Sequence, residues 1–320
     1  MKKLRGLLKR GAAAAHSAQP GVHVACFGKH PGWDDHMDHL GVDTEHLTEV
    51  WQRLYQDGVQ ANLDRGTWAN DLPDEQRLPG FAHEFLWQAG ETIDAGLMWA
   101  SKDRKGRADY PMIACVSAVH VGLDWVCREA QPVLNDLRKA CIDAPGSEGV
   151  VAAVTSAKDR LRGVLPDGQA ESGKVDSGGA IARLATLPPF AAEPEQFVRL
   201  IYHIERECGL DGERSGSVSL ASWPAQHLRV PGLVEDTMES LRLWISALGT
   251  LASGRPIFVC RATGQDWVDI TMGNPGVDEV FALLATPVAV PMVTSIPYEI
   301  DETDRKRILA LRDPPAGTIR

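Results

Sequence analysis

The apolar run at residues 110–119, YPMIACVSAV, constrains the fold of this chain more than any other stretch. A strand with one solvated face alternates apolar and polar residues, whereas this run is apolar almost throughout. We therefore expect a central strand that is covered on both faces. The charged residues 102–107 separate this run from a second apolar segment at 97–101, and this order predicts an antiparallel hairpin.

The rest of the chain mixes helices and strands without a regular alternation of the two. Helices are expected where apolar residues recur at spacings of three and four, and strands where short apolar runs end at Gly or Pro. This order predicts an α+β fold with a largely antiparallel central sheet flanked by helices. The predicted strands are 22–27, 85–87, 97–101, 110–119, 217–223, 256–263 and 267–271, with 287–296 extended, and the predicted helices are 47–63, 132–141, 150–164, 194–208, 234–252 and 278–284.

Composition divides the chain into one large domain and two tails. Residues 1–20 hold five cations and no acid, which favours a flexible basic end. Residues 21–300 are expected to form a single α/β domain. Within that domain, residues 166–189 are rich in Gly, Ser, Asp and Pro and predict a loop insertion. Residues 301–320 are expected to form a charged C-terminal tail.

Charge and composition exclude several classes of protein. The net charge of −10 argues against nucleic-acid binding, which needs a basic face. No window reaches the roughly 18 apolar residues of a membrane span. The six cysteines are scattered without a CxxC pair, as is typical of a cytoplasmic protein. Leu4, Leu7 and Leu8 lie among the cations of the basic tail, so contact with an anionic membrane surface is an alternative to a frayed end.

The residues best suited to binding or catalysis are clustered directly after the first predicted strand. Glycine and proline at positions 28, 31 and 32 force the chain to turn, and five of the ten histidines lie between His23 and His46. Such a loop either binds something or is a hydrogen-bonded corner with solvated histidines. A metal-dependent hydrolase is the catalytic alternative, because imidazole and carboxylate groups are common metal ligands. The candidate ligands are His30, Asp35, His36 and His39, with Asp34 beside them.

Other catalytic motifs are incomplete. Residues 168–174 match GxxxxGK by letter, but Val175 follows where a hydroxyl must reach a magnesium ion, and no apolar strand precedes the motif. Ser219 and His227 could be combined with nearby acids into a triad, yet no GxSxG elbow is present. We therefore expect no catalytic residue and no cofactor.

Short segments spread along the chain resemble one known family. Residues 27–35, FGKHPGWDD, look like a Gly-Lys-x-Pro-x-x-x-Asp-Phe signature, and residues 106–112, GRADYPM, look like a Gly-Arg-x-Phe/Tyr-Pro-Leu stretch. Both motifs are signatures of the TagF (ImpM) family, accessory proteins of bacterial type VI secretion. Residues 217–223, 256–261 and 280–284 are similar to later strands and a helix of that family. The chain departs from the family pattern at three places. His36 stands where the family signature has Phe, one extra residue separates Arg107 from Tyr110, and Trp223 is a single tryptophan where the family has two. With these departures, the chain resembles a divergent branch of the TagF family.

The resemblance implies a compact domain of longin or profilin type without catalysis. It implies a cytoplasmic protein that acts after translation, often as a brake on assembly of the secretion machine, by binding the forkhead-associated scaffold protein. The partner would be held by the turn after the first strand and by the charged hairpin turn. The implied partner-binding residues are Gly28, Lys29, Pro31, Trp33, Asp34, Asp35, Arg107, Tyr110 and Pro111.

Overall fold

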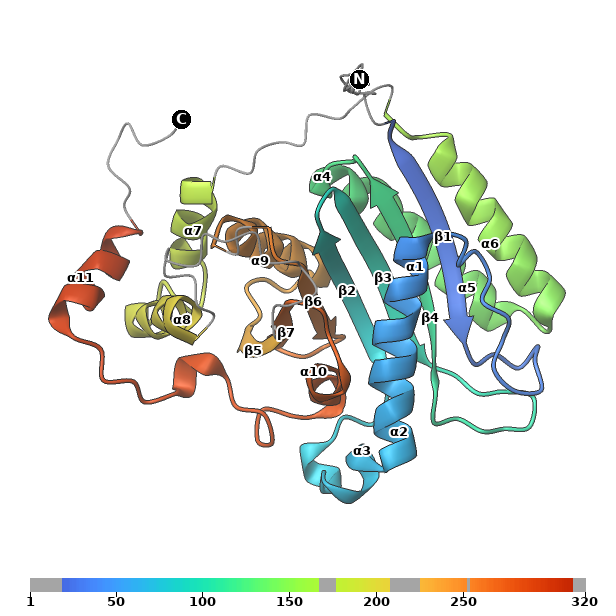
Figure 1. The fold of residues 1–320 in the computed structure, drawn as a ribbon, viewed down its shortest axis with the longest axis horizontal. Coiled ribbons are helices and arrows are strands. Elements are labelled where there is room, and N and C mark those ends of the chain that lie inside the picture. The colour runs from blue at the N-terminus through green and yellow to red at the C-terminus, as the bar shows by residue number, and fades with distance from the viewer. Residues whose placement is uncertain (1–18, 167–176, 208–224, 252–253, 313–320) are drawn as a thin grey trace, which may run out of the picture.

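The computed structural model describes residues 19–166, 177–207, 225–251 and 254–312. These residues form an open antiparallel sheet of seven strands with helices on both faces (Figure 1), so the predicted α+β class is confirmed. The strand order across the sheet is β1-β4-β3-β2-β6-β7-β5. The strands are β1 (Gly21–Gly28), β2 (Ala82–Ala89), β3 (Thr92–Ala100), β4 (Pro111–Val119), β5 (Gln226–Pro231), β6 (Ile257–Ala262) and β7 (Trp267–Met272).

The predicted hairpin is formed by β3 and β4, with Trp99 paired to Met112. β4 also pairs with β1, so it lies inside the sheet. Because successive side chains of a strand point to opposite faces, Met112 and Ala114 join one core while Ile113 and Cys115 join the other. Both cores are covered by helices, which explains why the sequence of β4 is apolar almost throughout.

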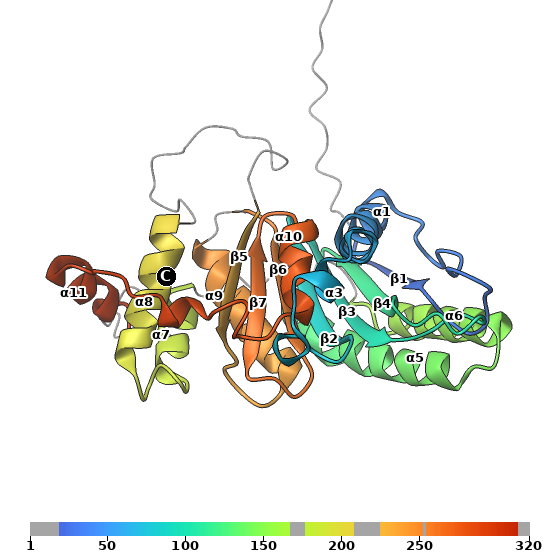
Figure 2. The same ribbon diagram turned by 90° about the horizontal axis from the view of Figure 1, so that it is seen from below.

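Helices cover both faces of the sheet, while α7, α8 and α11 lie beyond β5, next to α9 (Figure 2). On one face α6 contacts β1, α5 contacts β3 and β4, and α9 contacts β2 and β6. On the other face lie α1, the π-helical segment Trp51–Gln60, α2 and α10. Among the described residues, no helix is both long and apolar enough to cross a membrane. The helices are α1 (Glu45–Val50), α2 (Ala61–Arg65), α3 (Thr67–Asn70), α4 (Leu123–Trp125), α5 (Gln131–Asp143), α6 (Ser147–Arg162), α7 (Ser177–Thr186), α8 (Pro194–Glu207), α9 (Thr237–Leu251), α10 (Val277–Phe281) and α11 (Glu302–Ala310).

The long helix predicted over 47–63 is present as α1, the π-helical segment and α2. Thr44 caps its start by accepting a hydrogen bond from the Leu47 backbone at 3.1 Å. Gly66, with φ of +68°, ends it in the left-handed conformation that glycine adopts without strain. A Cβ at Gly58 would lie 2.6 Å from a methyl group of Val280, so this glycine lets α10 pack closely against the π-helical segment.

Four segments differ from their prediction. Residues 177–186, expected to be part of a loop insertion, form α7, because Ile181, Leu184 and Ala185 are buried against the helical layer that contains α9. The predicted charged tail 301–320 begins with α11, whose Ile308 is fully buried. β5 was not predicted, and the extended segment 287–296 contains a 3₁₀ turn at Val293–Ser295. The strand predicted at 217–223, residues 167–176 of the loop, the basic residues 1–18 and the end of the tail at 313–320 lie outside the described residues.

His83 on β2 predicts a loss of stability in acid. Its Nδ1 accepts a hydrogen bond from the Ala82 backbone at 3.1 Å, so Nε2 carries the proton and donates to the Leu283 carbonyl at 2.9 Å. Burial lowers the pKa of His83 to about 4, whereas an unfolded histidine has a pKa of about 6.5. The unfolded chain therefore binds this proton first, and the free energy of unfolding should fall by about 1.4 kcal/mol per pH unit between about pH 6.5 and pH 4.

Urea titrations across this pH range check the expectation, with the His83→Gln variant as a chain that lacks the titrating group. The free energy of unfolding of the variant should depend less steeply on pH than that of the native chain. Equal pH dependence in the two proteins would contradict the assigned role of His83.

Candidate functional site

Two loops that lie far apart in the sequence meet at one end of the sheet. The loop after β1, residues 29–39, and the β3–β4 connection, residues 101–110, lie side by side (Figure 1). We call them the motif loops. They meet because β4 pairs with both β1 and β3, which places Gly28 opposite Met112. All the residues that the sequence proposed for partner binding lie in or next to the motif loops.

Gly28 allows this close approach. Its φ is +115°, and a Cβ there would lie 2.2 Å from the Pro111 carbonyl oxygen. A side chain would therefore push the start of β4 away. Beyond the turn, the chain returns along β1, where Met37 donates to the Gly28 carbonyl at 2.9 Å and Leu40 exchanges two backbone hydrogen bonds with Cys26. This returning segment satisfies backbone groups at the outer edge of the sheet.

Asp103 joins the two motif loops from the inside. Its buried carboxylate accepts hydrogen bonds from Lys29 Nζ at 3.2 Å, from Arg107 Nε at 2.6 Å and from the Arg107 backbone at 3.0 Å. Desolvation alone would raise the pKa of Asp103, but these donors outweigh it and lower the pKa to about 2. The buried ammonium of Lys29 also lies 4.8 Å from the centre of the Tyr110 ring, a cation–π contact.

The outer surface of the motif loops carries alternating charges. Arg107 Nη2 lies 3.0 Å from Asp35 Oδ1 and donates to the Asp34 carbonyl, also at 3.0 Å. Arg104 Nη1 lies 3.2 Å from Asp34 Oδ1 while its Nη2 donates to the Gly32 carbonyl at 2.8 Å. Desolvation opposes a fall in the pKa of Asp35, yet the Arg107 charge lowers it. These four charged side chains are exposed, and their positions are fixed by one another.

Trp33 is half-buried. Its indole packs edge-on against the His30 ring with the centroids 5.7 Å apart, and its Nε1 donates to Asp38 Oδ2 at 3.3 Å. The Trp33 carbonyl accepts a hydrogen bond from the Arg104 backbone at 2.8 Å. Pro31, beside it, is exposed. Trp33 therefore ties the first motif loop to the second and still offers part of its ring to a partner.

The histidines of the first motif loop point in different directions. The Gly32 backbone donates to His30 Nδ1 at 2.9 Å, so Nε2 carries the proton and donates to the Cys141 carbonyl at 2.8 Å. His36 shares a hydrogen bond with the Tyr55 hydroxyl at 2.9 Å, and desolvation together with Lys29 lowers its pKa. The His39 ring lies 4.1 Å from the Trp51 ring, centroid to centroid. The four candidate metal ligands do not converge, and among the described residues no three His, Cys, Asp or Glu side chains are placed to hold an ion.

The remaining sequence candidates are dispersed. His227 donates from Nε2 to Asp269 Oδ1 at 2.8 Å, within a buried ion pair between β5 and β7. Its proposed partner Ser219 and the GxxxxGK stretch at 168–174 lie outside the described residues. The described structure therefore gives no geometry for either motif.

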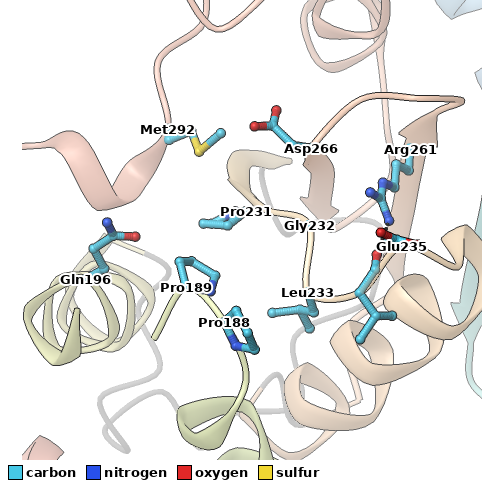
Figure 3. A pocket seen from close by; sticks show the side chains of 11 residues that line it. Pro188, Pro189, Gln196, Pro231, Gly232, Leu233, Glu235, Arg261, Asp266 and Met292 are labelled. Atoms are coloured by element: carbon cyan, nitrogen blue, oxygen red, sulfur yellow. Dashed lines mark hydrogen bonds between the residues drawn. The ribbon is translucent and has the colours of Figure 1, made fainter. Parts of the chain in front are cut away.

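A cleft of about 700 Å³ lies near the opposite edge of the sheet, next to β5 (Figure 3). Pro188 and Pro189 line it from the α7–α8 connection, and Pro231 from the end of β5. The Arg261 guanidinium at its wall already donates to the Gln265 carbonyl at 2.8 Å and to the Val234 carbonyl at 2.7 Å. Sequence reasoning missed this cleft, for which clustered prolines were the available signal.

Comparison with known families and with curated proteins identifies no relative of this chain. No protein-family model matches the chain, and a search of curated proteins finds no match. The functional reading therefore depends on the residues themselves and on the resemblance of the motif loops.

Proposed function

We propose that this chain is a non-catalytic cytoplasmic regulator of bacterial type VI secretion that binds a forkhead-associated scaffold protein, represses assembly after translation, and has a longin- or profilin-type domain. One observation carries the proposal. The two segments that resemble TagF signatures, about 75 residues apart in the chain, meet in a single charged surface at the motif loops. Residues that act together on one partner need such proximity.

The chemistry of the motif loops suits docking. The buried contacts of Asp103 with Lys29 and Arg107 hold both loops in place before any partner arrives. A preorganised surface loses less conformational entropy on binding than a flexible one. The exposed arginines and aspartates supply both signs of charge, which gives specificity and orientation in a complex. A half-buried tryptophan beside them is typical of the residues that contribute most to binding energy.

The metal-dependent hydrolase is the weaker candidate. Both ring nitrogens of His30 are occupied by hydrogen bonds inside the protein, so this residue would need a new tautomer and a new position to bind an ion. Elemental analysis of the chain purified without a histidine tag discriminates between the candidates. Stoichiometric bound metal would favour the hydrolase.

A binding measurement tests the proposal. Isothermal titration of the full-length chain with the purified forkhead-associated scaffold should give a saturable complex, with a dissociation constant below about 10 μM for an interface of standard size. The absence of binding at concentrations well above this value would contradict the proposed function.

A further inference from the structure

A second cavity, of about 530 Å³, opens beside the motif loops. The first motif loop contributes His30 and Pro31, the second contributes Ser101, Lys102 and Ala108, and the end of α5 completes the wall. The cavity is therefore continuous with the proposed docking surface, and a partner seated on the motif loops would also cover it.

The apolar part of this cavity can hold a large side chain. Trp99 at the end of β3 and Phe81 just before β2 are both buried and line it. Ile142, in the last turn of α5, also lines it and is 57% exposed. An apolar side chain that covered Ile142 would remove this exposed surface from water, which is favourable.

The polar part of the cavity is positive in a chain whose net charge is −10. The lining includes Lys102 and Arg138 but no Asp or Glu. The Arg138 guanidinium lies 6.0 Å from the Trp99 ring, and its Nε is buried without a hydrogen-bond partner in the described part of the chain. Glu84 on β2 acts on Arg138 electrostatically, but this carboxylate takes its hydrogen bond from Gln131 at 2.8 Å. A buried donor without a partner is costly, and an incoming acceptor would remove that cost.

We propose that this cavity is the anchoring pocket for an acidic segment of the protein partner. A bulky apolar side chain of that segment enters between Trp99 and Ile142, and a neighbouring carboxylate binds Arg138 and Lys102. Charge-assisted hydrogen bonds from a guanidinium to a carboxylate are about twice as strong as neutral ones. This inference rests on the proposed function and adds to it the chemistry of the partner.

Fluorescence anisotropy on the full-length chain tests the pocket directly. The probe is a fluorescein-labelled peptide, Gly-Asp-Glu-Phe-Asp-Glu-Gly, compared with one peptide in which Ser replaces Phe and another in which Lys replaces every acid. Both changes should weaken binding by about tenfold or more. Arg138→Gln should weaken binding of the Phe peptide to a similar extent, whereas Lys139→Gln, an exposed neighbour on α5 outside the cavity, should leave it unchanged.

Several outcomes would contradict the proposal that this cavity binds an acidic segment. These are no saturable binding up to about 1 mM peptide, equal binding of the three peptides, or equal loss in the Arg138 and Lys139 variants. Titration with the scaffold separates the two proposals. If the scaffold binds the Arg138→Gln and Ile142→Ser variants as tightly as the native chain, the pocket inference fails and the docking proposal stands. If the scaffold does not bind the native chain, the docking proposal fails, and the peptide titrations still decide on the pocket.

Discussion

Replacing Trp33 and Asp35 together with alanine is expected to abolish capture of the forkhead-associated scaffold by the full-length chain. Asp35 is the exposed acid that lies 3.0 Å from Arg107, so its loss breaks the charge pattern where the two motif loops meet. The Trp33 indole packs against His30 and donates to Asp38, so its loss removes the half-buried aromatic ring beside these charges. Loss of a central aromatic residue and a charged partner commonly costs a hundredfold or more in affinity. A pull-down with purified scaffold measures the effect.

Lys105→Ala is the matched control for this experiment, because Lys105 is an exposed residue of the second motif loop next to Arg104. This substitution should leave capture of the scaffold unchanged if the partner binds the arginine and aspartate pairs of the motif loops. Thermal unfolding followed by circular dichroism shows whether the double variant is still folded. A folded double variant that captures the scaffold as well as the native chain would contradict the assignment of the motif loops.

Replacing Arg229 with leucine is expected to lower the free energy of unfolding by about 3–5 kcal/mol, because it leaves a buried carboxylate without its partner. The guanidinium is 1% exposed and bonds both oxygens of Asp269, at 2.8 and 2.9 Å. It also donates to the Ala282 carbonyl at 2.7 Å and to Val290 at 3.2 Å, so β5 and β7 are connected to the segment that follows α10. Urea unfolding at neutral pH measures the loss.

The double variant Arg229→Leu with Asp269→Leu provides the comparison. Removing both charges avoids the isolated carboxylate, so this variant should be more stable than Arg229→Leu alone. The two backbone carbonyls that lose a donor, together with His227, which also donates to Asp269, make full recovery unexpected. A double variant less stable than the single one would contradict this account of the ion pair.

The sequence predicts a strand inside the sheet where both faces of that strand are buried, because its residues are then apolar almost throughout. β4 is such a case, and the charged turn before it predicted the hairpin with β3 correctly. The long helix between Thr44 and Gly66 was also predictable, since its apolar spacing, its cap and its terminating glycine agree.

Other elements depend on contacts that the local sequence does not show. α7 begins in a stretch of Ser and Gly with weak helix propensity, and it is stabilised by burying Ile181 and Leu184 against distant helices. β5 carries His227 and Arg229, polar residues that look like a surface loop. The structure buries Arg229 because Asp269 on the neighbouring strand neutralises it, and a sequence does not show such a cross-strand partner.

The same limit applies to the candidate site. Lys29, Asp35 and Arg107 could be singled out from the sequence, and the structure places them together. Asp103 was missed, because an aspartate in a charged turn looks solvated until the fold shows that its carboxylate is enclosed by Lys29 and Arg107. The arginine four residues later and the glycine between them, typical of a tight turn, were the only local signals.

Hydrogen–deuterium exchange of the full-length chain, with and without the forkhead-associated scaffold, tests the central claim most directly, because it maps the bound surface without any substitution. Docking at the motif loops predicts slower exchange within residues 29–39 and 101–110 in the complex, and little change in β5, β6 and β7. Unchanged exchange in both motif loops, with protection instead around Pro188 and Pro231 near the β5 edge of the sheet, would contradict it.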